Sequence, residues 1–145
     1  MRVEDKEVRS VEDVLREKGV YVSTTSGHSM RPLFADRRDT VIISPVSGRL
    51  KKYDVPLYRR GDQYILHRII KVKSDSYVIC GDNCVTKEYG ITDDQIVGVL
   101  TAFYRKDRYT EVSNFRYRIY AFVWCHTYYP RVFLKKVYWL IKRKK

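Results

Sequence analysis

The spacing of apolar residues changes twice along this chain. In the first 19 residues, Val14 and Leu15 follow Val11 by three and four positions, which places all three on one face of a helix. Ser10 stands where a helix N-cap belongs, and Gly19 is a typical residue after a helix end. The pattern therefore predicts an N-terminal helix that packs beside the region that follows it.

From residue 20 to residue 112 the pattern is typical of β-strands, because β-branched and aromatic residues form short runs separated by turn residues. The runs that we expect to form strands are 20–22, 40–43, 54–58, 64–73, 77–80, 96–105 and 109–112. Pro56 predicts an edge strand or a bulge in its run. Residues 74–76 predict the turn of a hairpin. Many short strands at close spacing indicate a mainly β fold, a partly open antiparallel β-barrel.

After residue 112 the chain contains nine basic residues and no acidic residue, and it is rich in Trp, Tyr and Phe. Its longest uncharged run, residues 119–130, is shorter than the roughly 20 apolar residues of a membrane-spanning helix. We expect two short helices separated near Pro130. Basic and aromatic residues together favour a helix that lies on anionic lipid. The alternative is a helical appendage that packs on the β region or on a partner, with its basic face in solvent.

These changes divide the chain into an N-terminal helix (1–19), a β domain (20–112) and a basic aromatic tail (113–145). The net charge of +12 favours anionic partners, namely a membrane surface or an acidic protein face, with nucleic acid less favoured. The odd number of cysteines, three, argues against a disulfide framework. No signal peptide is evident. We expect a cytoplasmic protein with free thiols, and peripheral membrane contact is the alternative that the tail suggests.

Candidate chemistry lies in three segments of the β domain. The first, residues 26–33, contains Ser29; the second, residues 66–70, contains His67; the third contains Asp82. A serine, a histidine and an acid are the parts of a nucleophile–base–orienter system. The arrangement predicts nucleophilic catalysis that needs neither a cofactor nor a metal ion.

Together the three segments resemble the signal peptidase I superfamily of serine peptidases, which includes the self-cleaving repressor peptidases. Residues 29–32 are similar to its Ser-Met-x-Pro signature. His67 followed by Arg68 resembles the endoplasmic-reticulum and archaeal-like branch, in which a histidine replaces the lysine of the bacterial enzymes. Residues 81–83 are similar to the Gly-Asp-Asn box of that branch. The resemblance spans roughly residues 20–104.

The resemblance implies that Ser29 is the nucleophile and His67 the general base, and that Met30 and Pro32 belong to the substrate-binding wall. A histidine base is chemically reasonable, because its ordinary pKa of about 6.5 needs little tuning at neutral pH, whereas lysine starts near 10.4. The acid that orients His67 is left open by the sequence. The candidates are Asp82, Glu88, Asp93 and Asp94.

The chain departs from the signal peptidase pattern just before the nucleophile. Signal peptidases commonly carry a hydroxyl residue two positions ahead of it, whereas this chain has Gly27 there and Ser26 one position further back. This spacing is closer to that of the self-cleaving repressors. The oxyanion would then rest mainly on backbone N–H groups, including that of Ser29.

These observations predict a serine endopeptidase that cleaves an extended leader or precursor peptide, bound as an added strand with small residues before the cut, as the resemblance implies. The main alternative is a catalytically weak or inactive module of the same fold. Such a module would bind a membrane surface, nucleic acid or a partner protein through the basic tail. A self-processing regulator is a third hypothesis.

Overall fold

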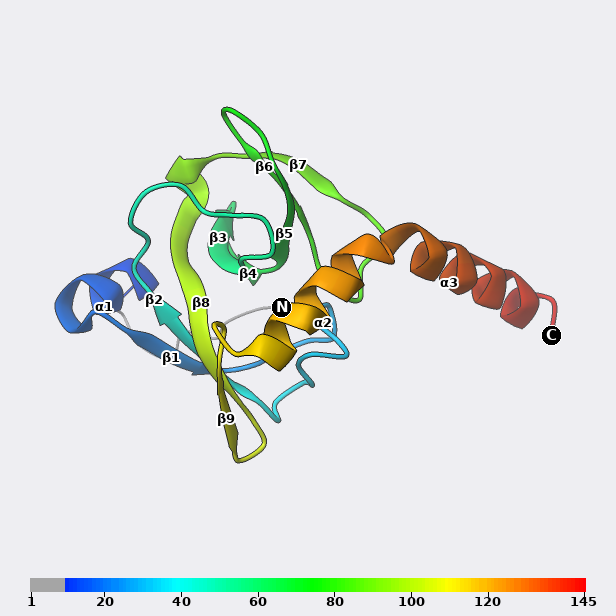
Figure 1. The fold of residues 1–145 in the computed structure, drawn as a ribbon, viewed down its shortest axis with the longest axis horizontal. Helices are drawn as coiled ribbons and strands as arrows, with labels where there is room; N and C mark the ends of the chain where they lie inside the picture. Colours follow the sequence, from blue (N-terminus) through cyan, green and yellow to red (C-terminus); the bar gives the residue numbers. More distant parts are fainter. Residues whose placement is uncertain (1–9) are drawn as a thin grey trace.

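The computed structural model describes residues 10–145. It is mainly β, with a curled half-barrel of strands and helices at both ends (Figure 1). The elements in chain order are α1 (Val11–Lys18), β1 (Tyr21–Thr24), β2 (Thr40–Ser44), β3 (Pro56–Arg60), β4 (Gln63–Leu66), β5 (Arg68–Val72), β6 (Tyr77–Cys80), β7 (Glu88–Ile91), the 3-10 helix η1 (Asp93–Gln95), β8 (Ile96–Arg105), β9 (Arg108–Glu111), α2 (Phe115–His126) and α3 (Tyr128–Arg143).

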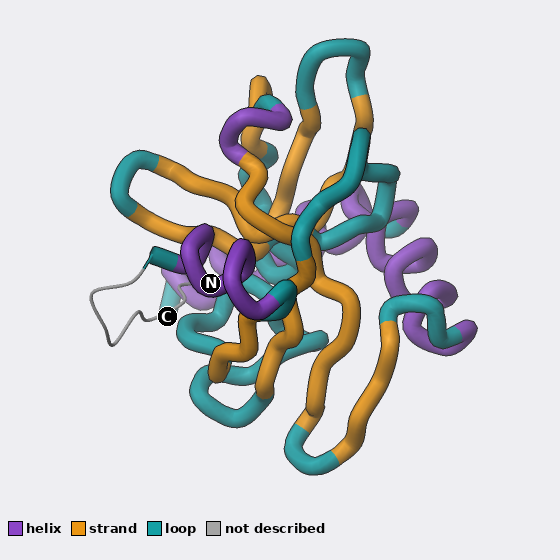
Figure 2. Tube along the Cα trace, turned by 90° about the vertical axis from the view of Figure 1, so that its left-hand side faces the viewer, coloured by secondary structure: helices purple, strands orange, loops and turns teal. Residues whose placement is uncertain are grey.

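The strands form two antiparallel sheets. The larger sheet has the order β1-β2-β8-β3-β4, with β9 also paired to β8, and the smaller sheet has the order β5-β6-β7. The ten-residue strand β8 pairs with β2, β3 and β9, so it forms the spine of the larger sheet (Figure 1). Figure 2 shows the strands in orange and the helices in purple. Its bounds and its pairing with the following strand confirm the sequence-based prediction for residues 96–112.

Local signals at the ends of α1 are also confirmed. The Ser10 hydroxyl accepts a hydrogen bond from the Asp13 backbone N–H at 3.2 Å, which satisfies one of the unpaired donors of the first turn. Gly19 ends the helix in the left-handed conformation with φ 71°, which glycine adopts at little cost. Val11 and Leu15 are buried in the core, and so α1 packs on the larger sheet.

The structure corrects one expected strand and decides between the two alternatives given for another. Residues 64–73 do not form one strand: the chain leaves the larger sheet after β4 and enters the smaller sheet at β5, and His67 lies between the two strands. β3 is not an edge strand, because it lies between β8 and β4. Pro56 is the first residue of β3, and the register against β8 shifts just beyond it, so the bulge alternative applies.

The tail contains two helices as expected, but they meet at Thr127 and not at Pro130. Pro130 lies in the first turn of α3, where its missing N–H costs no helical hydrogen bond. Tyr117 and Ala121 of α2 are buried. This agrees with the alternative in which the tail packs on the β domain. α3 has no buried residue, and its far end projects beyond the strands (Figure 1).

None of the helices between residues 10 and 145 is long and apolar enough to cross a membrane.

Candidate functional site

The fold brings the three predicted segments together. Ser29 lies on the loop between β1 and β2, and Asn83 lies on the turn after β6. The Asn83 backbone N–H donates to the Ser29 carbonyl at 2.9 Å, and the Asn83 side chain donates to the His28 carbonyl at 3.0 Å. These bonds join the serine loop to the Gly-Asp-Asn turn.

Gly81 lies between the backbone of Ser29 and the ring of His67. A Cβ atom at Gly81 would lie 2.6 Å from the Ser29 carbonyl oxygen and 3.0 Å from His67 Nε2. The first of these distances is too short for any real side chain, so only glycine fits here. The Ser29 backbone carbonyl and the His67 ring therefore both lie against Gly81.

His67 is held by a chain of hydrogen bonds that ends at Glu88. Its Nδ1 atom lies 3.3 Å from the Tyr58 hydroxyl, which in turn donates to Glu88 at 2.8 Å. Burial and the bond to Glu88 raise the pKa of Tyr58, so its hydroxyl keeps the proton. Because that proton is directed to Glu88, the Tyr58 oxygen accepts from Nδ1–H of the imidazole. Nε2 is then left with its lone pair.

The His67 side chain is buried, with 8% of the residue exposed, and its Nε2 atom has no hydrogen-bond partner. Burial, with a smaller effect from the charge of Arg60, lowers the pKa of His67 from 6.5 to about 3. The imidazole is therefore neutral near pH 7. No hydrogen bond joins His67 Nε2 to Ser29 in this structure. A pKa of about 3 makes the ring a weaker base than the ordinary value of about 6.5 suggested from the sequence.

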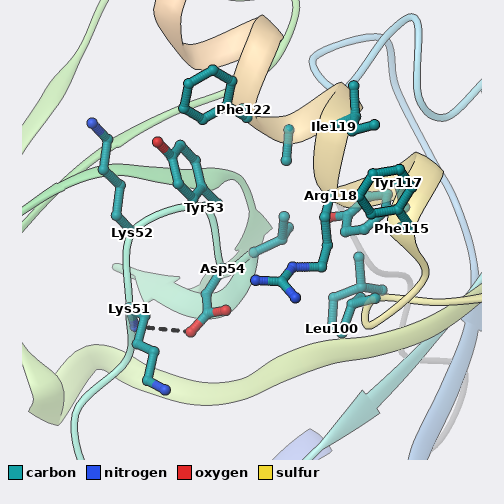
Figure 3. A pocket seen from close by; sticks show the side chains of 13 residues that line it. Lys51, Lys52, Tyr53, Asp54, Leu100, Phe115, Tyr117, Arg118, Ile119 and Phe122 are labelled. Carbon is teal, nitrogen blue, oxygen red and sulfur yellow. Dashed lines mark hydrogen bonds between the residues drawn. The ribbon is translucent and has the colours of Figure 1, made fainter.

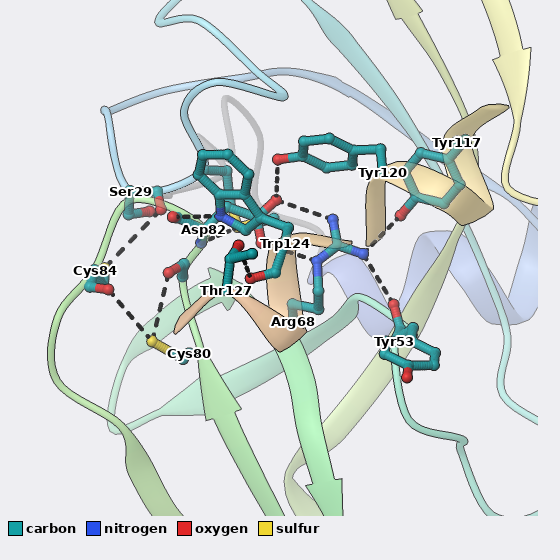
Figure 4. A network of polar contacts seen from close by, with 12 residues as sticks. Ser29, Tyr53, Arg68, Cys80, Asp82, Cys84, Tyr117, Tyr120, Trp124 and Thr127 are labelled. Atoms are coloured by element: carbon teal, nitrogen blue, oxygen red, sulfur yellow. Dashed lines mark hydrogen bonds and ion pairs between the residues drawn. The ribbon is translucent and has the colours of Figure 1, made fainter. Parts of the chain in front are cut away.

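Asp82 has a different position from the one expected of the orienting acid. Its carboxylate accepts two bonds from Arg68, at 2.8 and 2.9 Å, and a third from the Tyr120 hydroxyl at 2.7 Å (Figure 4). Arg68 and Asp82 are both almost completely buried. Asp82 therefore braces the turn through Arg68 and does not contact the His67 ring.

Of the four candidate acids, Glu88 is connected to His67, through Tyr58. Arg60 holds the Glu88 carboxylate with its Nε atom at 3.1 Å and with Nη2. Asp93, in η1, accepts from the Tyr77 hydroxyl and from Arg49. Asp94 is exposed.

The four predicted substrate-binding or oxyanion residues differ in their surroundings. Gly27 has φ 93° and donates its N–H to Asp36 at 2.7 Å, which shapes the serine loop. Met30 is fully buried, and its sulfur accepts a hydrogen bond from the Asp82 N–H at 3.4 Å, so it joins the serine loop to the Gly-Asp-Asn turn. Ser26 is partly buried, and Pro32 is exposed after a cis peptide bond.

Several residues of the site come from places that the sequence motifs did not mark. Tyr58 and Arg60 on β3 reach Glu88, as described above. Arg131 and Lys135 of α3 bond the Asp82 and Asn83 carbonyls, and Trp124 of α2 donates to the Asp82 carbonyl at 2.7 Å. These residues have no local motif, and only the contacts of the folded chain identify them.

A cavity of about 710 Å³ adjoins this arrangement and includes His67 in its lining. Another cavity, of about 490 Å³, lies between α2 and residues 51–55 (Figure 3). Its lining is largely apolar and includes Asp54, whose pKa is raised by burial, but it includes neither Ser29 nor His67. The cavity of about 710 Å³ has His67 in its lining but not Ser29.

Among residues 10–145 no three His, Cys, Asp or Glu side chains are grouped closely enough to hold a metal ion. Cys80, Cys84 and Cys125 are free thiols. A scan of protein-family models and searches of curated proteins and of solved structures found no match for this chain.

We predict that Asp82→Asn unfolds more easily than the natural chain, by about 3–5 kcal/mol, because it leaves the buried Arg68 charge without its counter-ion. Urea unfolding measures this difference. The control is Asp13→Asn, which breaks an exposed ion pair with Arg16 and should cost less than about 1 kcal/mol. Equal stability of Asp82→Asn and the natural chain would contradict the bracing role.

The low pKa of His67 predicts a pH-dependent stability. The unfolded chain takes up a proton on this residue near pH 6.5, whereas the folded chain does so only near pH 3. The stabilising effect is therefore complete above about pH 6.5 and is lost as the pH falls toward 3, at up to about 1.4 kcal/mol per pH unit. Urea midpoints between pH 4 and 8 measure the decline.

The stability of His67→Gln should decline less as the pH falls over this range. The stability of His28→Gln, a variant of an exposed histidine, should decline like that of the natural chain. The same decline in His67→Gln as in the natural chain would show that His67 does not cause it.

Proposed function

We propose that this protein is a serine endopeptidase resembling signal peptidase I, with Ser29 as nucleophile and His67 as general base. The observation that supports this most is the Nε2 atom of His67, which is buried, has no hydrogen-bond partner and borders the same glycine as Ser29. A buried polar nitrogen without a partner is costly. A general base that receives its proton during the reaction explains that cost.

In this mechanism His67 Nε2 takes the Ser29 hydroxyl proton as the oxygen attacks the carbonyl carbon of the scissile peptide bond. The resulting imidazolium keeps its Nδ1–H bond to Tyr58, whose hydroxyl donates to the Glu88 carboxylate that Arg60 holds in place. His67 then gives the proton to the leaving amine, and water hydrolyses the acyl-enzyme. Backbone N–H groups of the serine loop hold the oxyanion.

The substrate that fits this mechanism is an extended leader or precursor peptide. The cavity beside His67 is roomy enough, at about 710 Å³, for several side chains of such a peptide. No cofactor takes part in the proposed steps.

We predict that a fluorophosphonate probe labels Ser29 covalently in the intact chain. Ser29→Ala should lose labelling, and His67→Gln should slow it by roughly 100-fold or more, because general-base catalysis contributes about that much. Tyr58→Phe should give a smaller decrease, since it removes the hydroxyl that contacts His67, Glu88 and Arg60 but leaves the imidazole in place.

Mass spectrometry of the labelled peptide identifies the modified residue. Ser113→Ala, on the surface between β9 and α2, is the control and should label like the natural chain. Full labelling of Ser29→Ala would refute Ser29 as the nucleophile.

A specific feature of α3 supports a second role for the tail, namely peripheral docking on an anionic membrane. The apolar residues Phe133, Leu134, Leu140 and Ile141 share one face of the helix and are 59–66% exposed. Arg131 and Lys135, on the opposite face, contact the site. An exposed apolar face of this kind usually marks an interaction surface.

The charge of the tail favours lipid as the partner of this face. Lys136 and residues 142–145 are basic and exposed, and no acidic residue follows Glu111. Each basic residue near an anionic bilayer contributes about 1 kcal/mol, and apolar side chains at the headgroup level add to it.

We predict that the protein co-sediments with phosphatidylglycerol vesicles at low salt and much less with phosphatidylcholine vesicles, because the attraction is electrostatic and screened by salt. The double variant Leu134→Glu, Leu140→Glu should lose most of this binding. Val22→Glu changes an apolar residue of β1 that is 56% exposed, and it serves as the control. Unchanged binding of the double variant would exclude the α3 face as the docking surface.

A further inference from the structure

The cavity beside His67 has walls from three parts of the chain. Arg60 comes from β3, Lys87 and Glu88 from the start of β7 and the residue before it, and Lys135 and Trp139 from α3. Ile79 and Val85 add apolar surface. The tail helix thus forms a wall of the cavity that holds the candidate base.

The charges of this lining do not cancel. Glu88 is paired with Arg60 through two contacts, so this pair is close to neutral. Lys87 donates to the Tyr129 hydroxyl at 3.0 Å, and Lys135 donates to the Asn83 side-chain oxygen at 2.7 Å. Both partners are neutral groups. Within the described part of the chain, neither lysine forms an ion pair with a carboxylate.

Two uncompensated ammonium groups therefore border a partly enclosed space next to a neutral histidine. The bond to Tyr129 raises the pKa of Lys87, which favours its charged form. In such a space a carboxylate gains more from two ammonium groups than it would at an open surface. The apolar residues of the lining suit the methylene groups of a side chain that bears this carboxylate.

We propose that this cavity binds an acidic side chain of the peptide substrate, so that Lys87 and Lys135 select peptides with Glu or Asp near the cleaved bond. This inference rests on the proposed peptidase function and adds a substrate class to it. It differs from the small residues that the family resemblance implies before the cut. A single small anion would leave most of a cavity of about 710 Å³ unfilled, whereas an acidic residue within a peptide brings the flanking chain with it.

The fluorescence of Trp139, which lines the cavity, provides a direct measurement of binding. The intact chain carrying Ser29→Ala is titrated with end-blocked alanine nonapeptides that carry Glu, Gln or Lys at the centre. We expect the Glu peptide to bind at least about tenfold more tightly than the Gln peptide, a difference of about 1.4 kcal/mol, and the Lys peptide to bind most weakly. The difference should shrink as salt is raised. Loss of the signal in Trp139→Phe assigns it to this wall, because Trp124 is still present.

Charge variants test the two lysines separately. Lys87→Gln and Lys135→Gln should each reduce the Glu preference, and Lys87→Glu should shift the preference toward the Lys peptide. Because Lys135 also bonds Asn83, Lys87→Gln tests the charge without removing that contact. Lys18→Gln, at the exposed end of α1, should keep the full preference.

The outcomes separate this inference from the peptidase proposal. Labelling of Ser29 together with equal binding of the Glu and Gln peptides would overturn the acidic-substrate inference alone. A Glu preference that disappears in Lys87→Gln supports the inference even where Ser29 is not labelled, and the absence of labelling then counts against the peptidase proposal. A Glu preference that persists in both lysine variants would also overturn the inference.

Discussion

The buried ion pair between Arg68 and Asp82 holds the candidate site together. Arg68 directly follows His67 in the chain, and Asp82 directly follows Gly81, so the pair fixes both backbones beside the space that Ser29 borders. Arg68 also donates to the Tyr53 carbonyl at 3.0 Å and to the Tyr117 hydroxyl at 3.1 Å. A buried ion pair is tolerable only when its remaining polar atoms are also bonded, and here they are.

Because of this ion pair, Asp82 and Glu88, two of the acids that the sequence left as candidates, have different partners. Asp82 is occupied by Arg68 and Tyr120, and it acts on the position of the turn. Glu88 reaches the imidazole through the Tyr58 hydroxyl, and Arg60 keeps its carboxylate in place. The extra methylene of glutamate, compared with aspartate, moves its carboxylate outward, and the tyrosine fills the remaining distance.

One face of the tail helix α3 contacts the candidate site, and its other face is exposed. α2 packs on the β domain, and its Trp124 supports the Asp82 carbonyl. α3 continues this contact with Arg131 and Lys135, whereas its apolar residues point away from the strands. Arg131 and Lys135, which the sequence alternative placed on a solvated basic face, therefore donate hydrogen bonds to backbone carbonyls. These bonds hold the turn that carries the Gly-Asp-Asn box.

The sequence by itself determined the features that depend on neighbouring residues. The caps of α1 at Ser10 and Gly19, the hairpin turn before Tyr77 and the long strand β8 follow from local turn chemistry and side-chain periodicity. The motifs also indicated which three segments carry candidate chemistry. The tertiary structure decided that the chain changes sheets at His67, that Tyr58 connects His67 to Glu88, and that α3 forms a wall of the cavity. These depend on contacts between residues far apart in sequence, which local propensity and spacing do not encode.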